Sequence, residues 1–571
     1  MRTIAGIPAS PGTAIGPVFQ YCQVDLKFER RPAEETSKEW SRLEQALSEA
    51  AGQLGTIRSR ANRDIGQEEG AIFMAQAAML QDPELLGLAR KNLASTHLNA
   101  EAVWCDAAEH YAVLLEGLEN EYMRARAADV RDVSRRVLKI LLGIPETANR
   151  GPDLPSIICA EDLSPSDTVG LEKDLVLGFC TARGGETSHT AILARSLGLP
   201  AVVGAGEPVV GLAQGDRVIL SGSEGKLLVD PSGETVQTYK LRQNAEREAR
   251  LEALKESHLP AITLDGRRVE VVANIGDVSG ARLALESGAE GVGLLRTEFL
   301  YLERSKMPSE EEQYQAYREI LMVFGGRPVV LRTLDIGGDK DLPYLDQVRE
   351  MNPFLGVRGV RLCLARTDLF KPQLRAALRA GVGCNLKIMF PMVAVADEVR
   401  EARRILEECR AELEREGKPV AEQVEIGIMI EIPSAALLAD HLASEVDFFS
   451  IGTNDLTQYT LAVDRTNAAL SNLGSALSPA VLRLIREVVR AAHQQHKWVG
   501  LCGELAGELT AIPILLGLEL DEFSMNPTAI PGAKKAIRSM SMEKCRAVAE
   551  ATLAMEDAEE VKTYLASLKG S

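Results

Sequence analysis

The sequence is poor in several features that would point to particular classes of protein. Aromatic residues make up only 4% of the 571 residues, and no apolar run reaches the roughly 20 residues that a membrane-spanning helix needs. The nine cysteines include no C-x-x-C pair, which argues against a disulfide framework or a zinc site. The first residues, MRTIAGIPASPG, lack the apolar segment of a secretory signal peptide. We therefore expect a cytoplasmic protein that does not insert into a membrane.

Positive charge is also scarce. The formal net charge is −18, which argues against binding of nucleic acid or of an anionic membrane surface. An acidic surface suits a basic protein partner, although it also serves solubility alone. At roughly 150 residues per domain, the length favours three or four domains.

The spacing of apolar residues changes along the chain. From about residue 33 to 143 apolar residues recur every three or four positions, as at Leu43, Leu47, Leu54 and Ile57, which predicts packed helices. From about 157 to 230, short apolar runs separated by Gly, Asp and Ser predict the strands of a small mixed domain. The stretch from about 234 to 258 is charged and helical, as expected of a connector between domains.

After Pro260, short apolar runs alternate with helical segments to the end of the chain. The runs are VEVVANIG, GVGLLRTEF, PVVLRTLDIGG, LKIMFPMV, EIGIMIEIP, DFFSIGTND and WVGLCGELAG. Such alternation predicts a parallel sheet, most economically a closed eight-stranded α/β barrel. The stretch GVRGVRL, residues 356–362, is the candidate for the strand that this set lacks.

Polar residues end several of these runs, where such barrels carry their chemistry. They are Arg296, Arg332, Glu431, Asn454, Asp455 and Cys502, with Arg465 ten residues after Asp455 and Arg358 as a further candidate. Alone, each would more simply be a surface ion pair or a buried thiol. Together they predict a site for a small, multiply charged anion, because guanidinium groups match phosphate and carboxylate oxygens in pairs. Glu431 and Asp455 together fit Mg²⁺.

Histidine is rare, with seven residues, and His189 lies in the stretch GGETSHTAILARSLGLPAVVG. Thr187 or Ser188 can cap a helix from His189 to Leu197, and Gly198 can end it. Unpaired N–H groups at the start of that helix disfavour an imidazolium and would stabilise a phosphoryl group on the ring. A histidine that only forms a hydrogen bond there, or that acts as a general base, remains an alternative.

Two stretches carry a family resemblance. GGETSHTAILARSLGLPAVVG, residues 184–204, resembles the phosphohistidine signature of the phosphoenolpyruvate-utilising enzymes, and DFFSIGTNDLTQYTLAVDR, residues 447–465, resembles their second signature. The domain order is similar to that of the enzyme I family of the phosphoenolpyruvate-dependent sugar phosphotransferase system. The segments 471–481 and 526–535 depart from the pattern of that family.

The resemblance implies that phosphoenolpyruvate donates its phosphoryl group to His189, releasing pyruvate, and that the phosphocarrier protein HPr then receives it. It further implies that Thr168 orients His189 and that Cys502 protonates the enolate of pyruvate. The positions that match the phosphoenolpyruvate-binding residues are Arg296, Arg332, Asn454, Asp455 and Arg465. Glu431 and Asp455 match the Mg²⁺ ligands.

The resemblance also implies a domain organisation. Residues 1–32 and 147–230 form a swivelling phosphohistidine domain, 33–146 a helical HPr-binding subdomain, 231–260 a linker helix, and 261–571 a phosphoenolpyruvate-binding barrel that joins two copies into a homodimer. The candidate contacts with HPr are Glu68, Glu69, Met79, Asp82, Glu84 and Leu85.

Three other functions compete with this interpretation. A dikinase or phosphoenolpyruvate synthase needs a large nucleotide-binding domain, and a nitrogen-regulatory relative of enzyme I usually carries a sensory domain before its first domain; we expect neither here. A non-catalytic signalling scaffold would have lost residues from the barrel rim, yet each key position is occupied by the residue type that the family uses.

Overall fold

The computed structural model describes residues 1–571 except 22–25, 65–72, 75, 118–120, 146–150, 165–166, 169–170, 186–187, 303, 305, 338–343, 345–349, 465–469, 471–472 and 569–571. Of residues 59–64, 121–126, 189, 196, 250 and 302 it describes only the backbone. The chain divides into two compact units, Met1–Glu248 and Ala249–Ser571.

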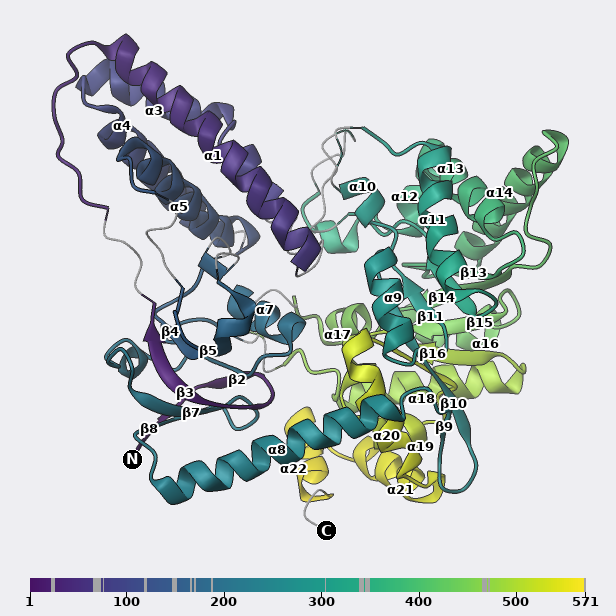
Figure 1. Cartoon of the computed structure of the whole chain (residues 1–571). Helices are drawn as coiled ribbons and strands as arrows, with labels where there is room; N and C mark the ends of the chain where they lie inside the picture. The colour runs from purple at the N-terminus through teal and green to yellow at the C-terminus, as the bar shows by residue number, and fades with distance from the viewer. Residues whose placement is uncertain are drawn as a thin grey trace. The chain divides into compact units, whose positions relative to one another are not determined.

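The first unit contains a group of long helices, which Figure 1 shows as a bundle. They are α1 (Thr36–Asp64), α3 (Pro83–Thr96), α4 (Ala100–Glu116) and α5 (Glu121–Leu141). Their apolar stripes meet in one core around the fully buried Trp104, with Leu43 and Leu54 from α1 and Val137 from α5. The predicted helical segment is therefore confirmed.

The first unit also contains a mixed sheet of strands. These are β1 (Arg2–Ala5), β2 (Ile7–Ser10), β3 (Thr13–Gln20), β4 (Ser156–Ala160), β5 (Val176–Thr181), β6 (Ala201–Val203), β7 (Arg217–Ser221) and β8 (Lys226–Val229). Their order is β1-β8-β7-β3-β4-β5-β6-β2, so strands from the N-terminal segment pair with strands that lie some 140 residues or more further along the chain. Helix α7 (His189–Leu197) packs against β2 and β6, and α8 (Gly233–Lys255) follows the sheet.

The second unit is built on a closed barrel. Its strands are β10 (Arg268–Ile275), β11 (Val292–Leu295), β12 (Pro328–Arg332), β13 (Asn385–Phe390), β14 (Glu425–Ile430), β15 (Phe448–Ile451), β16 (Trp498–Leu501) and β17 (Glu522–Met525). Among the described residues these eight strands are all parallel, and β10 pairs with both β11 and β17, which closes the ring. The short β9 (Ala261–Ile262) adds an antiparallel pairing to β10. The predicted barrel is therefore confirmed.

The predicted position of the eighth strand is wrong. GVRGVRL forms a turn followed by the first residues of helix α12 (Val360–Ala365), and the missing strand is β17. Gly359 explains the difference, because its φ of +57° is left-handed and lies outside the range of a strand. A Cβ at that position would also lie 2.8 Å from the Cβ of Met392.

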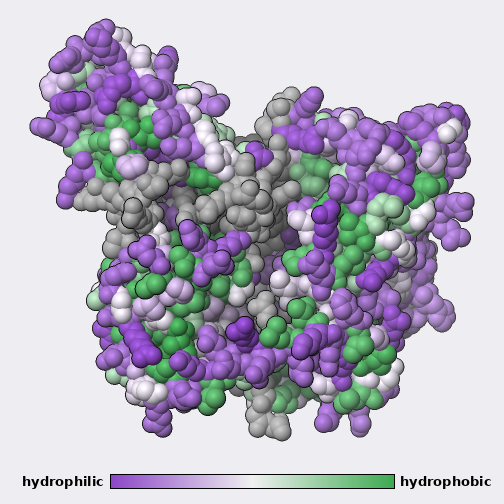
Figure 2. All heavy atoms as spheres, viewed as in Figure 1, coloured by the Kyte–Doolittle hydropathy of each residue, from purple (hydrophilic) through white to green (hydrophobic). Residues whose placement is uncertain are grey.

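Helices surround the barrel (Figure 1). They are α9 (Val278–Glu286), α10 (Phe299–Leu302), α11 (Glu310–Phe324), α12, α13 (Thr367–Ala380), α14 (Ala396–Arg415), α15 (Pro433–Leu437), α16 (Ala439–Leu442), α17 (Thr453–Leu461), α18 (Pro479–Gln494), α19 (Ile512–Gly517), α20 (Ile530–Arg538), α21 (Met542–Leu553) and α22 (Ala558–Leu568). Figure 2 shows that the outer surface around α14 is largely hydrophilic. Of the helices described, none combines the length and apolar character needed to span a bilayer.

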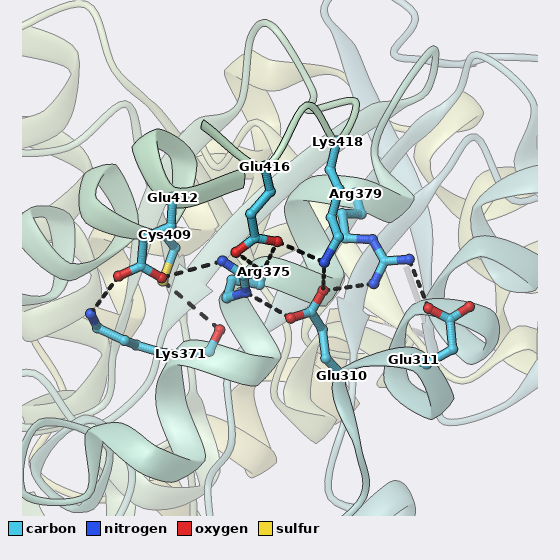
Figure 3. A network of polar contacts seen from close by, with 9 residues as sticks. All are labelled: Glu310, Glu311, Lys371, Arg375, Arg379, Cys409, Glu412, Glu416 and Lys418. Atoms are coloured by element: carbon cyan, nitrogen blue, oxygen red, sulfur yellow. Dashed lines mark hydrogen bonds and ion pairs between the residues drawn. The ribbon is translucent and has the colours of Figure 1, made fainter. Parts of the chain in front are cut away.

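A network of ion pairs joins the outer faces of α11, α13 and α14 (Figure 3). Arg375 of α13 contacts Glu310 at 2.7 Å, Glu412 at 3.2 Å and Glu416 at 2.8 Å. Arg379 contacts Glu310 at 2.6 Å. We refer to this set as the outer network; its remaining members are Glu311, Lys371, Cys409 and Lys418.

Candidate active site

The polar residues predicted at strand ends lie at one rim of the barrel, because parallel strands share their C-terminal edge. Arg332 is the last residue of β12. Arg296, Glu431 and Cys502 directly follow β11, β14 and β16, and α17, which carries Asn454 and Asp455, follows β15. The rim thus collects the charged residues and the thiol that the sequence singled out.

Arg332 is held by two carboxylates. Its Nη2 donates to Glu298 Oε1 at 2.8 Å, and its Nη1 lies 3.1 Å from Asp335 Oδ2. All three side chains are buried. Burial alone would lower the pKa of Arg332, but Glu298 and Asp335 outweigh that effect and raise the pKa, so the guanidinium remains charged.

Asp335 also holds a second guanidinium. Arg358 Nη2 donates to both carboxylate oxygens of Asp335, at 3.2 and 3.1 Å, and Arg358 Nη1 lies 3.6 Å from Asp455 Oδ1. The structure therefore brings Arg358, the further candidate from the sequence, to the same rim. Asp455 Oδ1 is buried and accepts no hydrogen bond from the part of the chain that the structure describes. We call the set Glu298, Arg332, Asp335, Arg358, Glu431 and Asp455 the rim network.

Glu431 is the most deeply buried carboxylate of the rim network. Its Oε1 accepts a hydrogen bond of 2.6 Å from the backbone N of Met392. Burial, and then the charges of Asp335 and Asp455, raise the pKa of Glu431 well above its usual range, against the effect of the arginines. Met392 has a left-handed φ of 59°, an unusual conformation for a residue with a side chain. The ionised form of Glu431 and the left-handed backbone of Met392 are therefore both unfavourable unless neighbouring groups stabilise them.

Cys502 lies where this charged rim meets the apolar interior of the barrel. Its side chain is buried beside Met429 and Phe448, and its Sγ donates to the carbonyl of Ile451 at 3.6 Å. Burial raises the pKa of the Cys502 thiol to about 11. The thiol therefore keeps its proton at neutral pH and can act as a proton donor.

The other predicted rim residues are Asn454, Arg296 and Arg465. Asn454 exchanges two hydrogen bonds with Glu504, one from its Nδ2 at 3.3 Å and one to its Oδ1 at 3.2 Å. Arg296 is half-buried next to β11. Arg465 lies outside the described residues.

Helix α7 has the predicted boundaries, from His189 to Leu197. Gly198 ends it with a left-handed φ of 66°, as predicted. Ser188 occupies the N-cap position, but its side chain makes no capping hydrogen bond. Its Oγ lies next to Gly184, and a Cβ added to Gly184 would be 3.0 Å from it. Thr187 and the side chain of His189 lie outside the described residues.

Two groups of predictions need adjustment. Asp335 and Glu298 were missed, although both lie within three residues of a strand end and a search of the whole loop would have found them. Among the HPr contacts, Leu85 is wrong, because its side chain is 1% exposed and packs in the helical core. Asp82 caps α3 by accepting from the backbone N of Glu84. Glu68 and Glu69 lie outside the described residues.

The donor set at the rim suits a hard cation with few protein ligands. Among the described residues, no three His, Cys, Asp or Glu side chains form a cluster that could hold a metal ion. Glu431 and Asp455 are nevertheless two buried carboxylates, the charge of Asp455 raises the pKa of Glu431, and Asp455 Oδ1 accepts no hydrogen bond from the described part of the chain. Mg²⁺ commonly uses one or two carboxylates together with substrate oxygens and water, so these residues fit it.

Comparisons with known proteins identify the family of this chain. Three family models match: PEP-utilising enzyme, N-terminal, at residues 5–126; PEP-utilising enzyme, mobile domain, at 153–225; and PEP-utilising enzyme, PEP-binding domain, at 250–542. The phosphoenolpyruvate-protein phosphotransferases of Priestia megaterium and Geobacillus stearothermophilus are both 47% identical to this chain. They cover 99% of it, and the alignments take in 99% and 98% of their own lengths. A solution NMR structure of an Enzyme I protein is 34% identical over 43% of this chain and 99% of that one, with a TM-score of 0.37.

Proposed function

Because the chain belongs to the phosphoenolpyruvate-utilising enzymes, and among them to the phosphoenolpyruvate-protein phosphotransferases, we propose that it moves the phosphoryl group of phosphoenolpyruvate through His189 to the carrier protein HPr. In this proposal residues 1–32 and 147–230 form the domain that carries His189, and residues 33–146 bind HPr. The linker is 231–260, and the barrel from 261 to 571 binds phosphoenolpyruvate.

One observation carries the proposal. The rim network places four carboxylates and two guanidiniums in a buried setting, with Asp335 shared between Arg332 and Arg358. A phosphate and a carboxylate on one small molecule would each offer a guanidinium a pair of oxygens, and a divalent cation would compensate the excess carboxylates. Phosphoenolpyruvate with Mg²⁺ supplies these charges together.

Phosphoryl transfer to His189 breaks the P–O bond of phosphoenolpyruvate and forms an N–P bond to the imidazole, at Nε2 as in the family. Arg296, Arg332, Asn454 and Arg465 would orient the substrate, and Asp335 and Glu298 would hold Arg332 in place. Positioning and charge compensation are what this reaction chiefly asks of a protein. The N–P bond then breaks when HPr accepts the group.

The second product begins as the enolate of pyruvate, which needs a proton on carbon. Cys502 holds one at Sγ, because the raised pKa of its thiol keeps it protonated at neutral pH. Transfer of that proton yields pyruvate and a thiolate, which water reprotonates. Cys502 is therefore proposed as the general acid of the second half-reaction.

Glu431 and Asp455 would hold Mg²⁺, which when bound supplies positive charge to the phosphoryl oxygens. Protein partners complete the proposal: the net charge of −18 suits a basic carrier protein, and the barrel is proposed to join two copies into a homodimer. Phosphoenolpyruvate is an intracellular metabolite, so the proposed reaction takes place in the cytoplasm.

The test is incubation of the protein with Mg²⁺ and phosphoenolpyruvate labelled in its phosphoryl group, without ATP. We expect an acid-labile label on the protein that is lost in His189→Ala and retained in His441→Ala, a matched change at an exposed histidine of α16. Added HPr should then remove the label from the wild-type protein. A label that persists in His189→Ala would refute the proposal.

Cys502→Ala separates the two half-reactions. We expect the variant to bind phosphoenolpyruvate like the wild type but to form pyruvate at least tenfold more slowly at steady state. Unchanged pyruvate formation would remove the thiol from the mechanism.

A further inference from the structure

A buried lysine joins helix α20 to the end of the connector helix α8. The side chain of Lys534 is 0% exposed. Its Nζ donates to the carbonyl oxygens of Ser257 at 2.9 Å and Gly288 at 2.7 Å, and it lies 3.1 Å from Glu290 Oε1. Two carbonyl oxygens thus accept hydrogen bonds from the ammonium, and the nearby carboxylate of Glu290 compensates its charge. Burying such a charge is unfavourable without partners, which indicates a site built to hold it.

The backbone around the lysine is shaped for the same contact. Ser257 lies just beyond α8 and is fully buried. Gly288 has a left-handed φ of 86°, and a Cβ there would lie 2.3 Å from the carbonyl oxygen of Ser257. Only glycine therefore allows the connector to approach so closely that Lys534 reaches both carbonyls.

Two more cations of α20 contact the last turns of α8 and the residues that follow it. Lys535 pairs with Glu252, and Arg538 Nη2 lies 3.0 Å from Glu256 Oε2. Lys534 and Lys535 belong to segment 526–535, one of the two segments for which the sequence suggested a departure from the family pattern.

The beginning of α8 is held separately, by the sheet of the first unit. Arg242 pairs with Glu224 at 2.6 Å, and Gln243 Nε2 donates to the carbonyl of Thr13 at 2.9 Å. Between these contacts and Ala253, which is buried, every side chain of α8 that the structure describes is exposed. The division between the two compact units also falls in this stretch, at Glu248 and Ala249.

We propose that Lys534 is a positioning residue that fixes the C-terminal end of the connector to the barrel, so that rotation of the His189-bearing domain occurs by bending α8 between Asn244 and Leu251. The inference rests on the proposed function, because that function requires His189 to reach both the barrel and HPr. A pivot with one fixed end returns the histidine to the same place at the rim in each cycle. Without the anchor, the connector would also open at Ala253–Ser257 and the histidine would reach the rim less often.

The test is Lys534→Met in the full-length protein, with Lys544→Met at an exposed position of α21 as the matched control. In the wild type we expect hydrogen exchange to be faster for the amides of 244–251 than for those of 253–257. In Lys534→Met the amides of 253–257 should exchange at least tenfold faster, while those of β14 remain unchanged. Slower exchange at 244–251 than at 253–257 in the wild type would overturn the pivot.

Kinetics provide a second readout. We expect the single-turnover rate of His189 phosphorylation to fall about tenfold in Lys534→Met, while binding of phosphoenolpyruvate to the barrel stays at the wild-type value. Equal exchange and equal rates in Lys534→Met and Lys544→Met would refute the anchor.

If Lys534→Met fails to fold, Gly288→Ala provides a second variant. It should increase hydrogen exchange of the amides of 253–257 in the same way, by pushing Ser257 away. Absence of phosphotransfer in the wild type would refute the proposed function, whereas the exchange experiment would still test the anchor.

Discussion

The barrel unit carries two charged networks made from the same kinds of residue, and they behave in opposite ways. In the outer network of Figure 3, hydrogen bonds from Arg375 and Lys418 lower the pKa of Glu416 to about 2. In the rim network, burial and the neighbouring carboxylates raise the pKa of Glu431. Both glutamates lie near arginines, so proximity to an arginine alone does not decide the direction.

The two networks differ in their exposure to solvent and in the ratio of carboxylates to cations. Carboxylates of the outer network each meet a cation and face solvent, so ionisation is favoured. At the rim, four buried carboxylates share two guanidiniums, and full ionisation leaves negative charge without compensation. A network of the first kind stabilises a fold, whereas one of the second kind is suited to receive a cation or an anion–cation pair.

The largest expected effect comes from breaking the shared carboxylate of the rim. Asp335→Asn leaves Arg358 buried with a weakened partner, and the free energy of unfolding of the barrel should fall by about 3 kcal/mol. Because Arg332 and Arg358 lose their common support, kcat/KM for phosphoenolpyruvate should fall at least a hundredfold, with a raised KM. Steady-state kinetics and hydrogen exchange of the slowest β13 amides measure the two effects. Asp397→Asn on α14, where the side chain is 87% exposed, should change neither; a wild-type KM in Asp335→Asn would show that the carboxylate does not position the arginines.

The next effect concerns pH. Burial, and then Glu270, raise the pKa of Glu522 inside the barrel to about 8. Between about pH 5 and pH 8 the folded state holds a proton that the unfolded state has lost, so stability falls by about 1.4 kcal/mol per pH unit as pH rises. Glu522→Gln should remove the share of this slope that comes from Glu522, while the share from Glu431 remains, and it should leave phosphotransfer unchanged. Denaturation midpoints across this pH range measure it, and an unaltered slope in the variant would show that the carboxyl titrates normally.

Glu416→Gln is the counterpart on the outer network, with the opposite sign. Because the folded pKa of Glu416 is lowered to about 2, its contribution is present above about pH 4.5 and is lost as pH falls toward 2. Glu416→Gln should therefore be less stable than the wild type above about pH 4.5, and the difference should disappear as pH falls toward 2. Denaturation midpoints at neutral and at acidic pH measure this, and a constant difference between the two proteins at all pH values would show that Glu416 titrates normally.

A smaller effect is expected from Arg375→Met. The side chain of Arg375 is 11% exposed and meets three carboxylates, so its loss should lower the free energy of unfolding by about 2 kcal/mol. The difference should shrink at high sodium chloride because salt screens these pairs. Denaturation at low and high salt measures this, and phosphotransfer should remain at the wild-type rate. A loss of activity would contradict the separation of the two networks.

The smallest effect is expected on the exposed face of α14. Arg404 pairs with Glu401 and Glu408, but its side chain is 55% exposed. Arg404→Ala should leave the melting temperature and kcat/KM within error of the wild type, because exposed pairs contribute little. A clear drop in melting temperature would show that the outer network extends along α14.

The sequence was sufficient for features that depend on neighbouring residues. Alternation of apolar runs predicted the barrel, and the residue after each run identified Arg332, Glu431 and Cys502. The C-terminal end of α7 followed from Gly198, and the predicted start at His189 is observed although Ser188 at the N-cap position makes no capping hydrogen bond. Strand β17 was missed because EFSM is short, begins with a charged residue and contains no β-branched residue.

Features that depend on distant residues could not be predicted in the same way. Asp335 acquires its role only because folding brings Arg358, 23 residues away, to its carboxylate. The raised pKa of Glu431 likewise depends on burial and on charges from other loops. Lys534 lies in the unusual segment 526–535, but its role could not be predicted, because its partners lie 277 and 246 residues earlier in the chain.

The left-handed residue Met392 has a consequence for how variants of the rim are interpreted. Its conformation is held in part by the hydrogen bond that its backbone N donates to Glu431 Oε1. Replacing Glu431 by alanine would release that bond, and the loop after β13 would relax toward an ordinary backbone geometry. Loss of turnover in such a variant would mix a missing ligand with a displaced loop. Asp455 is the position at which the two causes can be told apart, because its Oδ1 accepts no hydrogen bond from the backbone that the structure describes.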